Sequence, residues 1–175
     1  QSGLIKPFEE QTIKNILTLD LNRVEQIMTP RTVVFSLPSD MTVREARDQE
    51  RFLHHSRIPV YENDDSEEIV GIVYRRHIME ALANDQDTLL LADLMRPVRF
   101  VLETLTLDRL LLQFLESRNH LLVVLDEYGG ISGVVTLEDV MEEILGKEIV
   151  DETDQVADLR ELARQQRQQL TRSKE

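Results

Sequence analysis

The sequence contains no cysteine. Neither a disulfide bridge nor a zinc site with thiolate ligands can form without it, and the absence is consistent with a reducing compartment. Long apolar runs are also missing: the longest, such as residues 121–125, fall far short of the ~20 residues that a membrane-spanning helix needs. The first residues show no basic stretch followed by an apolar one, so no signal peptide is predicted. We expect this stretch of chain to be soluble.

Basic residues are scarce relative to acidic ones, with 20 Lys and Arg against 33 Asp and Glu and a net charge of −13. This balance argues against nucleic acid as a partner, because a nucleic-acid binder needs a basic face. It leaves room for a small anionic ligand, since backbone dipoles can oppose the overall field locally. With 175 residues, 41% of them hydrophobic, the chain can form one ordinary domain or two small copies that share a core.

The most informative feature that is present is an internal repeat. Residues 27–30 (Ile-Met-Thr-Pro) recur as residues 94–97 (Leu-Met-Arg-Pro). A short β-like run follows each opening, at residues 33–35 in the first copy and 99–102 in the second. A helix is then predicted after Thr42 and after Thr106, where apolar residues recur at helical spacing.

Each copy continues with two more strands and a helix. The first of these strands covers residues 57–61 or 120–125, and a turn follows it. The second strand is entered through a glycine, at 71–73 or 133–135, and leads directly into the last helix. Each copy therefore reads β-α-β-β-α over roughly 60 residues, about half a normal domain. We expect that neither copy can bury its apolar faces alone and that two together can.

These patterns divide the chain into four parts. Residues 1–23 form a leading helix and linker, with the helix at 8–19 and an apolar stripe of Phe8, Ile13, Ile16 and Leu17. Residues 24–84 form the first repeat and residues 85–145 the second. Residues 146–175 form a tail that is first acidic and then basic. This tail is either a surface helix or a frayed end, and we favour a partly ordered helix.

The tandem repeat, with its Met-x-Pro openings and a Gly-x-x-Thr-x-x-Asp ending, resembles a pair of cystathionine-β-synthase (CBS) domains from Val24 to Leu145. Residues 126–130 (DEYGG) and 133–140 (GVVTLEDV), with 28–31 near the front, are similar to the CorC/HlyC branch of magnesium/cobalt transporters. That branch includes CNNM-type and hemolysin-like proteins. The resemblance implies an α/β (α+β) fold, in which two CBS repeats pack as a pseudo-two-fold pair between N- and C-terminal helices.

The same resemblance implies partners and a location. Members of this branch typically join a membrane domain to a cytosolic CBS pair. We therefore expect a transmembrane domain of the same full-length protein as partner, at the cytoplasmic face of the membrane. CBS pairs commonly associate as flat two-fold dimers, so a homodimer is expected as well.

Two interpretations fit Thr136 and Asp139. In the first they form a capping box, in which Thr136 begins a helix and an acidic residue follows three positions later. In the second, which the resemblance favours, the carboxylate accepts hydrogen bonds from the two hydroxyls of a ribose. The two are compatible, because a helix N-terminus with free N–H groups also favours phosphate. In the first repeat Tyr74 and His77 occupy the matching positions without a carboxylate, so the pair is predicted to have one adenosine-type site.

The resemblance also implies which residues would line that site, since CBS pairs build it from both repeats. Val34, Ile58 and Val134 could enclose an adenine, and Arg57 could meet phosphate, with His120 a weaker candidate. Glu138 could approach phosphates only through a bridging cation, so an Mg²⁺–nucleotide is plausible. Carried over by position, the nucleotide-binding set is Thr29, Val34, Ser56, Arg57, Ile58, Pro59, Val134, Thr136, Glu138 and Asp139.

No catalytic residues and no metal site formed by the protein alone are predicted. The four histidines have no zincin spacing, and the serines show no nucleophile elbow. Gly129-Gly130 lacks the lysine of a P-loop and reads as a hairpin turn. The acidic run 62–68 lacks the ligand spacing of a calcium loop and reads as a solvated hairpin tip.

The expected function is that of a regulatory module. It would bind an adenine nucleotide, ATP or AMP with ATP favoured by the resemblance, between the two repeats. It would report occupancy to a membrane-embedded Mg/Co transport domain by population shift. The alternatives are a structural dimerisation module without a ligand, a CBS pair for another adenosyl ligand such as S-adenosylmethionine, and an enzyme that hydrolyses the nucleotide.

Overall fold

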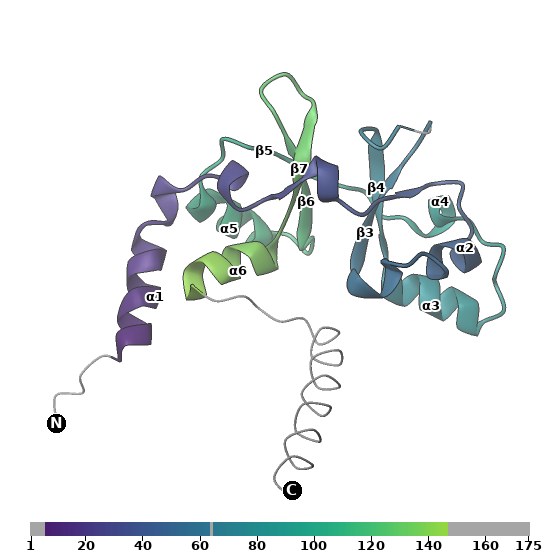
Figure 1. Cartoon of the computed structure of the whole chain (residues 1–175), viewed down its shortest axis with the longest axis horizontal. Coiled ribbons are helices and arrows are strands. Elements are labelled where there is room, and N and C mark those ends of the chain that lie inside the picture. Colours follow the sequence, from purple (N-terminus) through teal and green to yellow (C-terminus); the bar gives the residue numbers. More distant parts are fainter. Residues whose placement is uncertain (1–5, 64, 147–175) are drawn as a thin grey trace, which may run out of the picture.

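The computed structural model describes residues 6–63 and 65–146. These residues form two lobes, each with a small sheet and helices on the outer side of that sheet (Figure 1). The two sheets lie next to each other in the middle of the molecule. The structure confirms the predicted α+β fold of two β-α-β-β-α repeats.

The elements follow one another in the predicted order. The chain begins with α1 (Pro7–Leu17) and the 3-10 helices η1 (Leu19–Leu21) and η2 (Val24–Gln26), and then crosses between the lobes through β1 (Thr29–Pro30) and η3 (Arg31–Val33). The first lobe contains β2 (Leu37–Pro38), α2 (Val43–Arg47), η4 (Phe52–His54), β3 (Arg57–Tyr61), β4 (Ile69–Tyr74), α3 (Arg75–Ala83) and α4 (Leu91–Leu94). The second lobe contains β5 (Phe100–Leu102), α5 (Leu107–Glu116), β6 (Leu121–Leu125), β7 (Ile131–Thr136) and α6 (Leu137–Leu145).

The two sheets repeat one design. In the first lobe the strand order is β2-β3-β4, with β2 parallel and β4 antiparallel to β3. In the second lobe β5 and β7 flank β6 in the same way. The register shifts at matching places, between Val60 and Tyr61 and between Val124 and Leu125. The internal repeat of the sequence is therefore a repeat of structure down to its irregularities.

The opening segments of the repeats are exchanged. Strand β1, which opens the first repeat, pairs with β7 of the second, with Thr29 opposite Val134. In the reverse direction, Ile72 of β4 exchanges two backbone hydrogen bonds of 2.8 and 2.9 Å with Arg96 from the opening of the second repeat. Each opening thus extends the sheet of the other repeat, and the exchange fastens the lobes together.

Glycines make both exchanges possible. A methyl group placed on Gly133 would lie 3.0 Å from the carbonyl carbon of Thr29 and closer still to its oxygen. A methyl group on Gly71, at the matching position, would lie 2.9 Å from Met95 Sδ and 3.1 Å from the carbonyl oxygen of Arg96. The backbone of one repeat approaches the other at these points because no side chain intervenes.

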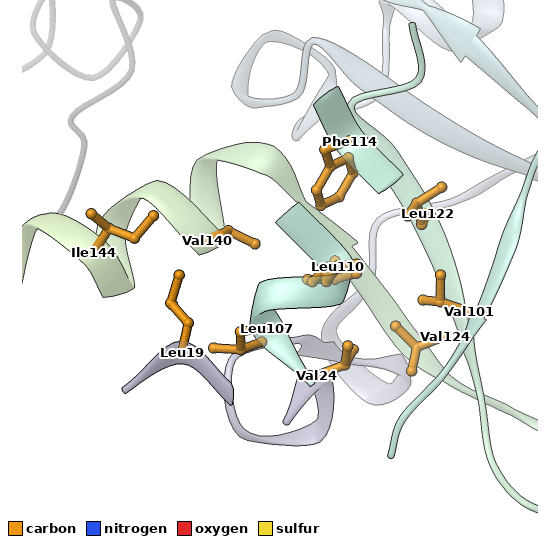
Figure 2. Packing of buried hydrophobic residues seen from close by; sticks show 11 residues of the cluster. Leu19, Val24, Val101, Leu107, Leu110, Phe114, Leu122, Val124, Val140 and Ile144 are labelled. Atoms are coloured by element: carbon orange, nitrogen blue, oxygen red, sulfur yellow. The ribbon is translucent and has the colours of Figure 1, made fainter. Parts of the chain in front are cut away.

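The buried side chains form three clusters. The cluster of the second lobe is built on α5, α6, β6 and β7, yet Leu19 and Val24 from the beginning of the chain complete it (Figure 2). In the first lobe Leu91 of α4 has the corresponding role. A third cluster joins the two sheets and contains Ile69, Ile72, Leu121, Val123 and Val134. Each repeat therefore depends on the other for part of its core.

One local prediction was wrong, and one predicted helix forms but is short. Residues 33–35 do not form a strand. Arg31–Val33 is a 3-10 helix, and Val34 and Phe35 have no regular structure, because the opening of the first repeat pairs with β7 through β1 instead. The helix after Thr42 is only five residues long, although its capping box with Glu45 forms as the sequence suggests. Phe52 instead enters the core from the separate 3-10 helix η4.

The leading helix lies against the end of α6. Asn15 Nδ2 of α1 donates to the carbonyl oxygen of Ile144, at 3.1 Å. The proposed apolar stripe of α1 is exposed, with Phe8, Ile13, Ile16 and Leu17 between 47 and 74% accessible. No helix in the described part of the chain is long and apolar enough to cross a membrane. The tail beyond Gly146, for which we favoured a helix, lies outside the described residues.

Candidate functional site

A cleft of about 630 Å³ opens where the two repeats meet. Volumes of this size are usual for small-molecule sites. All of the predicted site residues except Ile58 and Asp139 line it. The lining consists of Thr29, Val33, Val34, Phe35, Arg51, His54, His55, Ser56, Arg57, Pro59, Leu121, Val134, Thr136 and Glu138. Because the first repeat supplies one wall and the second the other, a molecule in this cleft would touch both.

Part of the cleft lining is apolar. Val34 follows η3 in the first repeat, and Val134 lies at the centre of β7 in the second. Pro59 and Leu121 add further apolar surface from β3 and β6. The exchange of β1 produces this arrangement, because it places the segment after Pro30 beside the strand that carries Val134.

The side chain of Ile58 does not take part, which corrects the expected adenine enclosure. Ile58 is fully buried in the core of the first lobe. Successive residues of a strand face opposite sides of the sheet, so Arg57 and Pro59 line the cleft while Ile58 points to the helices.

Six residues of the cleft lining were missed by the sequence reasoning: Val33, Phe35, Arg51, His54, His55 and Leu121. The rings of Phe35 and His55 stack at a centroid distance of 5.1 Å, and the Arg51 guanidinium lies 5.6 Å from the Phe35 centroid. Burial, followed by the positive charges of Arg51, His54 and Arg75, lowers the pKa of His55 from its ordinary value. Phe35 and His55 directly adjoin Val34 and Ser56, so adjacency to the expected residues was the only signal in the sequence.

Thr136 and Asp139 form the capping box at the start of α6. The backbone N–H of Thr136 donates to Asp139 Oδ2 at 2.7 Å, and the N–H of Asp139 donates to Thr136 Oγ1 at 3.2 Å. Burial raises the pKa of Asp139, against the opposing effect of these hydrogen bonds. The capping interpretation is confirmed. The ribose contact stays a prediction, and Asp139 is not among the residues that line the cleft.

The corresponding turn of the first repeat is built differently. Tyr74 begins α3 without a side-chain hydrogen bond to the helix. Its ring lies 5.3 Å from the ring of His77, which takes the place of the aspartate. This turn therefore offers a phenol ring and an imidazole where the second repeat offers a hydroxyl and a carboxylate.

Arg57 connects the repeats across the mouth of the cleft. Its Nη1 donates to Glu138 Oε1 at 3.3 Å, and its Nη2 lies 3.2 Å from His120 Nδ1. The side chain of Arg57 is 22% exposed and that of Glu138 49%, so the pair is only partly desolvated. Such pairs contribute little to stability, and an anion that enters the cleft can compete with Glu138 for the guanidinium. His120, the weaker candidate, contacts Arg57 instead of lining the cleft.

A search for groups of three or more potential metal ligands (His, Cys, Asp or Glu) among residues 6–63 and 65–146 finds none.

Comparison with known proteins places this geometry in context. The model of the CBS domain family matches residues 24–84 and 91–146. A UPF0053 protein of Synechocystis is 40% identical over 174 residues, which is 99% of this chain and 50% of that protein. The magnesium and cobalt efflux protein CorC of Escherichia coli is 33% identical over 166 residues, 94% of this chain and 56% of that protein. The chain thus spans about half the length of these curated relatives.

Solved structures show the same fold with nucleotides. The CBS domain of a bacterial CNNM/CorC family Mg²⁺ transporter in complex with ATP is 34% identical, with a TM-score of 0.75 over 81% of this chain and 99% of that one. A CBS-domain pair with bound AMP from Klebsiella pneumoniae is 25% identical, with a TM-score of 0.61 over 71% of this chain and 98% of that one.

Proposed function

The chain belongs to the CBS domain family, as a tandem pair of the CorC/CNNM magnesium and cobalt transporter type, and from this premise we propose that it binds an adenine nucleotide in the cleft between its repeats. The observation that carries the proposal is the cleft itself. It combines an apolar part around Val34 and Val134 with the hydroxyl of Thr136 and the cation of Arg57, and it draws on both repeats. An adenine needs the apolar part, and a ribose phosphate needs the hydroxyl and the cation.

Each part of the nucleotide has a candidate partner. The adenine lies between Val34 and Val134, and Thr29 and Thr136 flank the sugar. Asp139 accepts from the ribose hydroxyls after a small displacement of Thr136, since only its Oδ2 is engaged among the hydrogen bonds of the described residues. The phosphates meet Arg57 and displace Glu138. Mg²⁺, when present, enters with the phosphates and offsets the negative charge of Glu138.

Nucleotide binding would regulate a larger protein. Because the ligand touches both repeats, it favours the arrangement in which they are clamped together, and this shift can be passed to an attached domain. The named relatives include efflux proteins for magnesium and cobalt, so we propose that the attached domain transports divalent cations and that the CBS pair lies at the cytoplasmic face of the membrane. The role is one of binding and regulation, without catalysis.

We propose a homodimer as the working state. Leu112 and Leu115 on α5 are 56 and 69% exposed, and their spacing of three residues places them on one face of the helix. Large apolar residues adjacent on a helix surface are typical of interfaces. Sedimentation should show a dimer that Leu115→Glu dissociates, while a monomeric parent chain would contradict the proposal.

The central experiment is calorimetry and thermal unfolding with ATP, AMP and Mg²⁺. Millimolar nucleotide should raise the melting temperature of the parent chain, as any ligand of the folded state does. The matched variant is Asp139→Asn, which keeps an oxygen to accept from the N–H of Thr136 and thus keeps the helix cap. It should fold with a similar melting temperature and lose most of the shift.

The outcomes separate the alternatives. If nucleotide causes neither heat nor a shift in melting temperature, the module is a structural one without this ligand. If S-adenosylmethionine displaces ATP with higher affinity, the ligand is another adenosyl compound. Steady release of phosphate from bound ATP would show an enzyme and contradict the regulatory role.

A further inference from the structure

The first helix carries an apolar stripe that the described residues leave largely exposed. Ile13, Ile16 and Leu17 of α1 are 48, 50 and 74% accessible, and their spacing of three and four residues places them on one flank of the helix. Another side of α1 faces α6, where Asn15 donates to the carbonyl oxygen of Ile144 (Figure 1). Adjacent large apolar side chains that remain open to water are typical of an interaction surface.

The chain leaves the described structure beside this stripe. Gly146 ends α6 in the left-handed conformation, with a φ of 63°, and a methyl group placed on it would lie 3.4 Å from Asn15 Nδ2. A left-handed residue at the end of a helix turns the chain away from the helix axis. Residues 147–175 therefore start next to α1. Residues 147–155 alone can span up to ~30 Å, about twice the ~16 Å length of α1, so the residues after them can reach the whole stripe.

The sequence of this tail has the pattern that the stripe requires. Its apolar residues are separated by three, four and seven positions, which is the spacing of one narrow helical face: Val156, Leu159, Ala163 and Leu170. Three basic residues lie along one flank of that face: Arg160, Arg164 and Arg167. The first turn of α1 is acidic, and within residues 6–63 and 65–146 neither Glu9 nor Glu10 forms an ion pair. The tail and α1 therefore match both in apolar pattern and in charge.

We propose that residues 155–170 dock on α1 as an amphipathic helix and cover its apolar stripe. Because the chain leaves the second lobe near the last turn of α1, the docked segment runs back along α1, antiparallel to it. Leu159 then packs against Ile13, and Arg164, just over one turn further, comes beside the acidic first turn that contains Glu10. The opposite direction would carry the arginines away from these carboxylates. The proposal does not depend on nucleotide binding.

A disulfide test is direct, because the chain has no cysteine of its own. Ile13→Cys is combined with Leu159→Cys in one full-length chain and with Glu161→Cys in another. Nearly the same length of chain leads to both tail positions, but two residues along a helix turn the side chain by about 200°, to the opposite face. Docking brings only the first pair to the ~4 Å between Cβ atoms that a disulfide requires. We expect the first pair to oxidise within one chain roughly tenfold faster or more, because docking raises the effective concentration of its thiols.

Hydrogen exchange measures the docking without a cross-link. Leu159→Gln removes an apolar contact and should speed the exchange of the α1 amides roughly tenfold, because part of their protection comes from the docked segment. The matched control is Glu161→Gln, on the opposite face of the segment, which should leave the exchange unchanged. Glu10→Lys reverses a charge beside the stripe and should speed the exchange at low salt, with a smaller effect at high salt.

Three results would overturn the docking. Equal oxidation rates for the two cysteine pairs would show that the tail meets α1 only by random collision. Disulfides that form only between two chains would assign the stripe to a second copy of the protein. If Leu159→Gln leaves the exchange of α1 unchanged, the tail does not cover the stripe, and protection of α1 by vesicles of anionic lipid would then assign it to a membrane surface. A melting curve by circular dichroism verifies that each variant is folded, which the exposed position of Ile13 favours.

Discussion

Because the opening segments are exchanged between the repeats, we expect the fold to be unusually sensitive to substitution of Gly133. In Gly133→Ala the added methyl carbon meets the Thr29 carbonyl group and also lies 3.3 Å from Pro30 Cα. All of these are backbone atoms that no side-chain rotation can move away. To reach ordinary contact, β1 and β7 would have to separate by on the order of 1 Å, which exceeds the tolerance of an N–H···O bond. The variant therefore loses the pairing that fastens the first repeat to the second.

Two contributions determine how much Gly133→Ala lowers the free energy of unfolding. Inserting a methyl group into a packed site costs about 1–3 kcal/mol, and the upper part of this range applies because the contact is with backbone. Loss of one backbone hydrogen bond between the strands adds about 1 kcal/mol. We therefore expect Gly133→Ala to lower the free energy of unfolding by about 3–4 kcal/mol, a large share of the stability of a domain of this size.

Gly71→Ala is the matched control. Its methyl group meets the flexible end of Met95 at 2.9 Å and the Arg96 carbonyl oxygen at 3.1 Å, so a rotation of Met95 and a shift of a few tenths of an ångström suffice. We expect a cost of about 1 kcal/mol. Both variants replace glycine by alanine in a strand at matching positions, so the effect on the entropy of the unfolded chain cancels in the comparison.

Urea unfolding followed by circular dichroism measures both variants, since the chain has no tryptophan for fluorescence. Nucleotide titration of the same samples tests the site, because Thr29 and Val134 both line the cleft and their separation should weaken binding. If Gly133→Ala is as stable as Gly71→Ala, the close approach of β1 to β7 is not a determinant of the fold and the reasoning fails.

Two further predictions concern the residues around the cleft. Thr136→Ala should lower the free energy of unfolding by about 1 kcal/mol through loss of the helix cap, and Thr136→Ser should restore it; equal stability of the alanine variant in urea would contradict the capping role. The lowered pKa of His55 means that the unfolded chain takes up its proton first as the pH falls below the ordinary value of 6.5. Stability should therefore decrease with falling pH between 6.5 and the lowered folded-state pKa, and His55→Gln should flatten that part of the curve; parallel pH profiles of unfolding would refute it.

Much of the fold could be predicted because the same pattern of residues occurs in two copies in the sequence. The last strand and helix of each copy follow a glycine-led apolar run, and the threonines at positions 42 and 136 have an acidic residue three positions later, which is the pattern of the capping boxes that form. These features are local, since the residues that determine them lie within one turn or one strand. Their positions in the sequence therefore identify them directly.

The errors concern contacts between distant residues. Val33 and Val34 have the composition of a strand, but their conformation depends on β1 pairing with β7, some hundred positions further along the chain. The orientation of Ile58 likewise depends on which face of β3 receives the helices, and alternation alone does not say which face that is. A cavity of about 260 Å³ beside the cleft, lined in part by Arg57, Arg75 and Arg76, was missed because these residues become neighbours only through the antiparallel pairing of β3 with β4.

The structure also offers a physical route from the cleft to the beginning of the described chain. Coupling between a site and a distant part needs an element that both contact. Helix α6 meets this condition, because it begins at the cleft with Thr136 and ends at Ile144, whose carbonyl oxygen accepts from Asn15 of α1. A ribose that draws Asp139 toward the cleft acts on the first turn of this nine-residue helix, and a short helix moves as one body. Leu19, just after α1, packs in the same core as Val140 and Ile144, so α1 and α6 must shift together or lose that packing.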